Sequence, residues 1–220
     1  MAGQQQEEIE TIRSRTIEVK LSDADVKRIS EKAAAHGLTV GELIENFIGD
    51  LVCGTYSNGS DERMYAEQWF ERCWFGMFPD YTFLKYLIEQ WGLDEVIEAW
   101  EDIENSQETI ADTEKSLASG EIQGMGGKTY TWKDITNSEG TPIYSSKEEW
   151  EQEERTAMQD EQEYIADRRT TIDDYWNEYA EMKKEYKNGT FEEEMKKVLD
   201  YWQEYQSFLE GKSLGENDNG

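Results

Sequence analysis

Histidine, cysteine and proline are scarce in this sequence, which has one, two and two of them in 220 residues. Because His36 is the only histidine, a catalytic triad or a histidine-containing metal site would depend on a single residue. Cys53 and Cys73 are too few for a disulfide framework and stand in no metal-binding spacing. We therefore expect a protein without enzymatic activity, without a metal site and without any other cofactor.

Long apolar runs are also missing. No stretch approaches the roughly 18 apolar residues that a membrane-spanning helix needs. Residues 1–10, MAGQQQEEIE, have neither the basic start nor the apolar stretch of a secretory signal peptide. From these observations we expect a cytoplasmic protein that does not contact a membrane.

Basic residues are few relative to acidic ones. The sequence has 22 Lys or Arg against 50 Asp or Glu, which gives a formal net charge of -28. A surface with this excess repels nucleic acid and anionic membranes. Hydrophobic residues, at 36%, still supply enough apolar mass for a core, so the chain is expected to fold into one large or two small domains.

The stretch 15–52 has the pattern of a short strand followed by two helices. Apolar and polar side chains alternate over 16–21, as in a half-buried strand. Ser22 predicts the start of the first helix and Gly37 its end. The pair Thr39 and Glu42 predicts a capping box that opens the second helix. Such a small unit cannot bury all its apolar residues alone.

These residues, RTIEVKLSDADVKRI followed by HGLTVGELIENFI, resemble the ribbon-helix-helix family of Arc- and MetJ-type DNA-binding domains. The resemblance implies that two chains pair their strands into an antiparallel ribbon, which makes the unit an obligate homodimer. The side chains that it places in the dimer core are Ile17, Val19, Leu21, Leu43 and Phe47. Those that it places outward, where the family reads bases in the major groove, are Thr16, Glu18 and Lys20.

The charge of this unit departs from the family pattern. DNA readers of this type favour basic or amide side chains on the ribbon, whereas Glu18 stands in its middle here. The stretch 15–52 holds five basic and seven acidic residues, so the electrostatic contribution that supplies most affinity for DNA is missing. We interpret the unit as a dimerisation module in which DNA binding is weak.

We predict a mainly α protein in which this unit precedes an acidic, antiparallel coiled-coil-like helical domain. Residues 1–14 are expected to be flexible, 15–53 to form the dimerisation unit and 61–210 to form the acidic domain. A polar linker at 53–60, CGTYSNGS, separates the two. Residues 211–220 are expected to be disordered.

Aromatic residues gather at 61–78, directly after the linker. One interpretation is a core helix that packs against the helices of the acidic domain. The other is a surface for a partner, because aromatic anchors are enriched at the centres of protein interfaces. Its main candidates are Trp69, Trp74 and Phe75.

The acidic domain is predicted to contain helices at about 80–91, 94–119, 146–187 and 190–210, the first of them capped by Asp80. The helices at 94–119 and 146–187 should run antiparallel, and the last helix should fold back alongside them. Heptad positions along 146–187 are Met158, Ile165, Ile172, Tyr179 and Tyr186. Between them Glu161 and Arg168 predict a hydrated seam in the first half.

Residues 120–145 differ in composition from the helices on either side, with several glycines and a stretch around Tyr130 in which polar and aromatic residues alternate. They predict a small β-hairpin insertion or an ordered loop, with its turn near 137–140. The GGKT sequence within this segment does not form a phosphate-binding loop, because the required first glycine is replaced by Ile122.

The acidic charge gives the main hypothesis about function. Residues 61–220 hold 40 acidic and 16 basic residues. Rows of carboxylates on long helices can imitate the phosphates of a duplex, and a basic groove evolved for nucleic acid would accept them. Phage and plasmid inhibitors of restriction or CRISPR nucleases are similar in composition. We interpret the chain as a dimeric, non-enzymatic DNA mimic of mobile-element origin that blocks a basic, nucleic-acid-binding partner such as a nuclease or toxin.

The candidate partner-binding residues combine the aromatic segment with carboxylates of the long helix. They are Trp69, Trp74, Phe75, Glu153, Glu154, Asp160, Glu161, Asp173 and Asp174. Two alternatives stay open. The carboxylates could serve only to solubilise the helices, or the chain could be a transcription regulator or antitoxin that binds operator DNA through 16–20.

Overall fold

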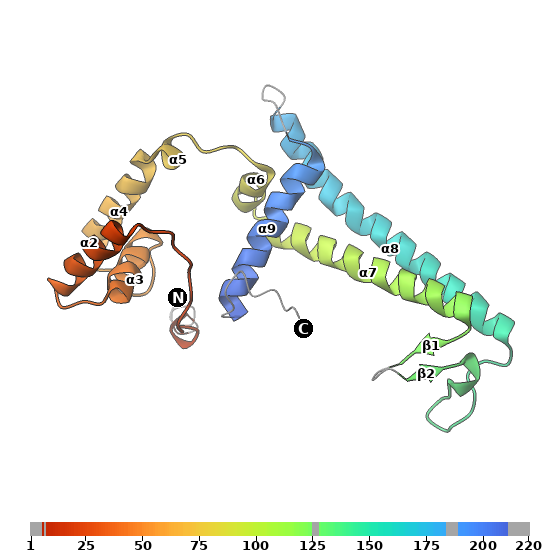
Figure 1. Ribbon diagram of the computed structural model, residues 1–220. Coiled ribbons are helices and arrows are strands. Elements are labelled where there is room, and N and C mark those ends of the chain that lie inside the picture. Colours follow the sequence, from red (N-terminus) through yellow and green to blue (C-terminus); the bar gives the residue numbers. More distant parts are fainter. Residues whose placement is uncertain (1–5, 7, 125–127, 184–188, 211–220) are drawn as a thin grey trace. The chain divides into compact units, whose positions relative to one another are not determined.

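The computed structural model describes residues 6, 8–124, 128–183 and 189–210. It is mainly helical and has one small antiparallel sheet of two strands, as predicted (Figure 1). The chain divides into two compact units, Met1–Tyr81 with Gln203–Gly220, and Thr82–Trp202. We call them unit 1 and unit 2. No helix in the described ranges is long and apolar enough to cross a membrane.

From residue 23 on, the N-terminal part of unit 1 contains the helices α2 (Asp23–Ala34), α3 (Val40–Leu51), α4 (Ser60–Arg72) and α5 (Trp74–Met77). The two predicted helix starts are confirmed. The Ser22 hydroxyl accepts from the amide of Asp25, and Thr39 forms the capping box with Glu42. Gly37, with φ of +74°, follows α2 in the left-handed conformation that favours glycine.

The predicted linker at 53–60 is an ordered turn that joins α3 to α4. Asp50, one of the few buried residues of unit 1, accepts hydrogen bonds from the backbone amide of Asn58 at 2.7 Å and from its side-chain amide at 2.9 Å. Arg63 donates to the Ser57 hydroxyl at 2.7 Å. These contacts keep α3 and α4 in the same unit, and the division between units falls after Tyr81 instead.

The predicted ribbon strand has no partner strand in the described part of the single chain. Residues 12–22 adopt no regular secondary structure. The alternating side chains of Ile17, Val19 and Leu21 are all about half exposed. The ribbon therefore stays a prediction about the assembled protein.

Unit 2 is built around two long helices. It begins with α6 (Phe83–Glu89) and α7 (Leu93–Ser119), followed by β1 (Ile122–Gln123), β2 (Thr129–Tyr130) and the 3-10 helix η2 (Trp132–Asp134). The long helix α8 (Lys147–Met182) comes next, followed by α9 (Phe191–Glu210), whose residues up to Trp202 belong to unit 2. Helices α7 and α8 lie side by side and antiparallel, with the strands at the connection between them (Figure 1).

The segment between α7 and α8 contains two backbone pairings in its described residues rather than the single predicted hairpin. Strand β1 pairs with β2 in the register Ile122 opposite Tyr130. The predicted turn near 137–140 also exists, but it closes an isolated bridge between Thr136 and Pro142. There the Asn137 side chain accepts from the amides of Glu139 and Thr141, each at 3.0 Å. An Asx turn of this kind needs no strand on either side.

The predicted cap of α6 was wrong by two residues. Thr82, not Asp80, precedes the helix, and its hydroxyl accepts from the amide of Lys85 at 3.1 Å. The predicted end of α8 at 187, including Tyr186, lies outside the described residues. Helix α9 starts as predicted. The amide of Thr190 donates to the Glu193 carboxylate at 3.0 Å, and the amide of Glu193 donates to the Thr190 hydroxyl at 3.3 Å.

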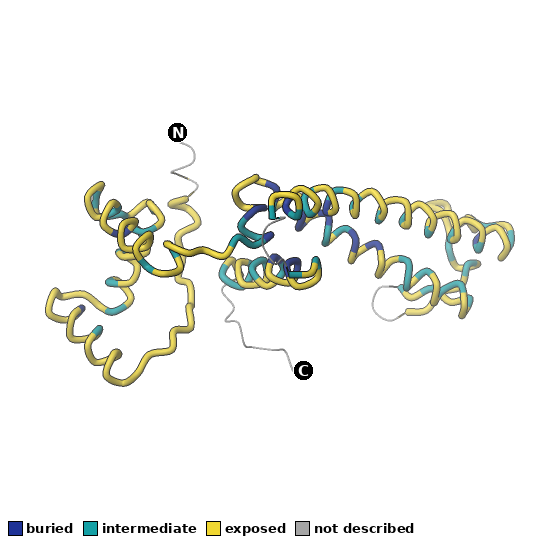
Figure 2. Tube along the Cα trace, turned by 90° about the horizontal axis from the view of Figure 1, so that it is seen from above, coloured by how far each residue is buried: buried dark blue, intermediate teal, exposed yellow. Residues whose placement is uncertain are grey.

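The core of unit 2 lies where α6, α7, α8 and α9 meet (Figure 2). Five aromatic rings join there with centroid distances of 5.3 to 6.2 Å: Phe83, Tyr86, Trp176, Tyr179 and Phe191. Further along the seam, Ile172 is buried, whereas Met158 and Ile165 are only half-buried. Met158 and Ile165, in the half of the seam that was predicted to be hydrated, are thus less covered than Ile172.

Helix α9 does not run alongside α8 over its length as predicted. Its first turn contacts the end of α8 through Phe191 and Trp176. At the end of unit 2, the Trp202 indole donates to Glu101 of α7 at 2.8 Å. The helix thus crosses from α8 to α7 (Figure 1). Met195 and Val198, on its apolar stripe, are buried.

A buried carboxylate fixes this crossing. Glu194 of α9 is 3% exposed, and it accepts the backbone amide of Phe83 at 2.7 Å, one of the amides that the first turn of α6 leaves without an intrahelical partner. Burial by itself would raise the pKa of Glu194. This effect is outweighed by hydrogen bonds from Lys197 and the Phe83 amide and by the positive charges of Lys197 and Lys183, which together hold the pKa below 4.5. Glu194 therefore acts as a charged cap from a distant helix.

Replacing Glu194 by glutamine is expected to lower the free energy of unfolding by about 1.5–3 kcal/mol at neutral pH, since a charged, buried hydrogen bond is lost. Because the pKa is lowered on folding, this stabilisation is present above pH 4.5 and is lost as the pH falls through the folded value. Urea unfolding at pH 7 and pH 4 measures both effects. Glu204→Gln, exposed on the same helix, is the control, and equal stability of the two variants at pH 7 contradicts this role.

Candidate functional site

The side chains that most often form catalytic or metal sites do not gather in this structure. Within the described ranges, no three residues among His, Cys, Asp and Glu are placed to share a metal ion. His36 is exposed just after α2. Cys53 is exposed and Cys73 half-buried, and neither forms a disulfide. The features that stand out are two surfaces of opposite chemistry, one on each unit.

The first surface is the acidic hairpin, which we define as α7 with α8. Helix α7 carries nine acidic residues and one lysine, and α8 carries thirteen acidic and four basic residues. On α8 four carboxylates recur every seven residues and are all exposed: Glu153, Asp160, Asp167 and Asp174. We call them the acidic row. No described residue forms a hydrogen bond or ion pair with their carboxylates.

Other acidic side chains of the hairpin are engaged by aromatic donors. Phenol or indole groups donate to them at 2.6 to 2.9 Å in the following pairs: Tyr164 to Asp102, Tyr175 to Glu95, Tyr86 to Glu178, Trp150 to Glu154 and Trp202 to Glu101. The bonds to Asp102 and Glu95 raise the pKa of Tyr164 and Tyr175. The hairpin thus has two sets of carboxylates, one that fixes the fold and one that faces solvent.

The predicted carboxylates fall into both sets. Glu153, Asp160, Asp173 and Asp174 are exposed. Glu154 is half-buried and bound to the Trp150 indole at 2.9 Å, and Glu161 is half-buried. Asp167 was missed, although its seven-residue spacing from Asp160 and Asp174 was visible in the sequence.

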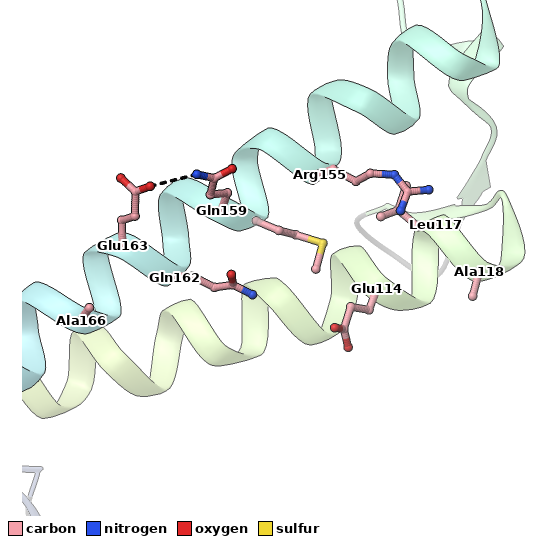
Figure 3. A pocket seen from close by; sticks show the side chains of 9 residues that line it. Glu114, Leu117, Ala118, Arg155, Gln159, Gln162, Glu163 and Ala166 are labelled. Carbon is pink, nitrogen blue, oxygen red and sulfur yellow. Dashed lines mark hydrogen bonds between the residues drawn. The ribbon is translucent and has the colours of Figure 1, made fainter.

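Toward the sheet, the seam of the hairpin opens into a groove of about 840 Å³ (Figure 3). Leu117 and Met158 contribute apolar surface, and Glu114, Arg155 and Glu163 contribute charge. A hydrogen bond of 3.0 Å from Gln159 holds the Glu163 carboxylate on one side. Polar residues occupy positions where a continuous coiled coil would place apolar ones, and Leu117 and Met158 are only half-buried here.

The second surface is aromatic and lies on unit 1. We define the aromatic cluster as Phe47, Trp69, Phe70, Trp74 and Phe75. Ring contacts join Phe47 to Trp69 at 5.3 Å, Trp69 to Phe75 at 6.2 Å and Phe70 to Phe75 at 5.3 Å. All five side chains are exposed by more than 40%, and Trp74 by 71%. Four of the five rings are joined by these contacts, Trp74 neighbours Phe75 along the chain, and all five rings stay exposed within unit 1.

The ribbon candidates belong to neither surface. Thr16, Glu18 and Lys20 are exposed in the segment without regular structure. Of the predicted dimer core, Leu43 is half-buried, and Phe47 belongs to the aromatic cluster. The sequence did not predict that the aromatic segment continues the apolar face of α3, because that contact depends on how the ordered turn at 53–59 folds.

No protein-family model matches this chain, and no curated protein or solved structure matches it either.

Proposed function

We propose that this protein is a non-enzymatic binding protein whose acidic hairpin occupies the nucleic-acid-binding surface of a basic partner and blocks it. The observation that carries the proposal is the acidic row on α8, together with the other exposed carboxylates of α7 and α8. A nuclease or a toxin with a basic groove has the surface chemistry that fits it.

The charge density of the hairpin supports this proposal. Helix α8, with 36 residues, is about 54 Å long, and α7 lies beside it. The excess of carboxylates over basic groups on the two helices then amounts to roughly one negative charge per 3 Å, close to the one per 3.4 Å of a single nucleic acid strand. A groove that binds a phosphate backbone would meet a comparable number of charges.

The stiffness of the hairpin supports it as well. Its carboxylates project from two packed helices. The hydroxyls of Tyr164 and Tyr175 on α8 donate hydrogen bonds to Asp102 and Glu95 on α7 and so join the two helices. A flexible acidic tail would lose conformational freedom on binding, whereas the helices already hold the carboxylates in place. The fold therefore presents the charge at little further entropic cost.

The alternative, operator binding through 16–20, has less support in the geometry of α3. In a ribbon-helix-helix reader the start of the second helix would hold a phosphate. Here the Glu42 carboxylate accepts the Thr39 amide at 2.7 Å and the Thr39 hydroxyl at 2.8 Å, and these bonds lower its pKa. A phosphate would have to displace a like charge at this position.

The test is a competition experiment on a labelled DNA duplex bound to a basic nuclease. We expect the protein to displace the duplex at low salt, and we expect its apparent affinity to fall at least tenfold between roughly 50 and 200 mM salt, as counterions compete. Polyglutamate at the same carboxylate concentration is the control and should displace less. If restriction, CRISPR-associated and toxin nucleases all keep their DNA at low salt, the proposal fails.

A further inference from the structure

Unit 1 has helices but almost no core. Among its described residues only Ala33, Asp50 and Ala66 are buried, and none of them is a large apolar side chain. Unit 2, by contrast, buries several large side chains completely, among them Trp150, Tyr86 and Phe83. A unit of this size without a core does not stay folded alone, so some other surface has to cover it.

The apolar surface that needs cover is large and continuous. Half-exposed rings leave roughly 100 Å² each, so the five residues of the aromatic cluster leave about 500 Å². The cluster continues through Phe47 into the face of α3, where Ile44, Ile48 and Val52 are also exposed. The sum reaches the roughly 800 Å² per partner of a stable interface and exceeds the patch that monomers usually expose.

We propose that a second copy of this chain covers the aromatic cluster, so that the self-association surface extends from the predicted ribbon unit through α4 and α5. An apolar surface that is required for folding must be covered permanently, which a transient partner cannot do. A second copy is always present in equal amount. A basic nucleic-acid-binding groove is polar and fits the carboxylates of unit 2 instead.

This inference goes beyond the proposed function and stands without it, because the two interfaces respond to salt in opposite directions. Two copies with a net charge of -28 each repel one another, and salt screens that repulsion. Self-association should therefore strengthen with salt while partner binding weakens. Each proposal can fail while the other holds.

The experiment is hydroxyl-radical footprinting of the full-length chain, read by mass spectrometry at submicromolar and at tens of micromolar concentration. Trp74 is 71% exposed in the single chain, and its oxidation is expected to fall roughly fivefold at the higher concentration as the ring enters an interface. Trp91, 93% exposed on unit 2, is the internal control and should not change. If Trp74 is oxidised as fast in the dimer as in the monomer, the inference is wrong.

A double variant tests the same surface through the molecular mass of the protein in solution. Trp69→Ser combined with Phe75→Ser is expected to raise the dissociation constant of the dimer roughly 100-fold, whereas Trp91→Ser leaves it unchanged. Light scattering over a dilution series measures it at low and high salt. A wild-type chain that is monomeric at tens of micromolar, or a double variant that dimerises like the wild type, overturns the proposal. If the double variant does not fold, footprinting of the wild type still decides.

Discussion

Replacing Glu153, Asp160, Asp167 and Asp174 by their amides is expected to weaken binding to a basic nuclease roughly 100-fold at low salt, since each exposed ion pair is worth about 0.5–1 kcal/mol. All four side chains are exposed, and no described residue binds their carboxylates, so the fold should not change. The measurement is the same duplex competition, repeated with the variant. The loss should shrink as salt rises.

The matched control separates the acidic row from net charge. Glu10, Asp23, Glu31 and Glu45 are exposed acidic residues of unit 1. Replacing these four by their amides changes the net charge by the same amount and removes no carboxylate from α8. Affinity should stay within about threefold of the wild type, as expected when only the screened, long-range field changes. Equal losses in both variants would mean that overall charge, and not the hairpin, drives binding.

Replacing Phe83 by alanine is expected to lower the free energy of unfolding of unit 2 by about 3–5 kcal/mol, the usual range for a buried aromatic ring. The ring is completely buried and contacts Tyr86, Trp176 and Tyr179. Its loss leaves a cavity where α6 meets α8. Urea unfolding followed by near-ultraviolet circular dichroism, which reports on packed aromatic rings, measures the change.

Trp91→Ala is the control for this prediction. Trp91 lies just after α6 and is 93% exposed, so its removal should change stability by less than about 0.5 kcal/mol. A comparable loss in both variants would show that α6 contributes to stability through its exposed face. That result would contradict the assignment of the core to the face of Phe83.

Local signals in the sequence predicted the helices well. Thr39 with Glu42, and Thr190 with Glu193, define helix starts through contacts three residues apart, and the structure confirms both. The long helices on either side of the β-hairpin were visible from their periodicity. Signals of this kind depend on neighbours along the chain and not on the tertiary fold.

The core was harder to predict, because α6 has two apolar faces. Helical spacing places Leu84, Leu87, Ile88 and Trp91 on one apolar face, whereas the structure buries Phe83, Tyr86 and Leu87. Both faces fit helical spacing, and only the neighbouring helices decide which one is covered. The hydrogen bond between Glu194 and the Phe83 amide joins residues that are 111 positions apart in the sequence, and no local pattern predicts such a bond.

The candidate site was predicted in part. The sequence identified the exposed carboxylates at 153, 160, 173 and 174, but Glu154 binds an indole within the fold. A sequence does not distinguish a carboxylate that faces solvent from one that binds a phenol or indole within the fold. That distinction depends on where the nearest tyrosine or tryptophan lies in the tertiary structure. Trp69, Trp74 and Phe75 are exposed, which favours the interpretation of a contact surface.

The bonds from tyrosine to carboxylate also set an alkaline limit for the hairpin. The pKa of Tyr164 and Tyr175 is raised above 10.0 by the bonds to Asp102 and Glu95, so this stabilisation is complete below pH 10 and is lost as the pH rises through the folded values. A phenolate beside a carboxylate replaces a donor with a second negative charge. Alkali therefore turns these two contacts between α7 and α8 into points of repulsion, which should weaken the seam while each helix keeps its own backbone hydrogen bonds.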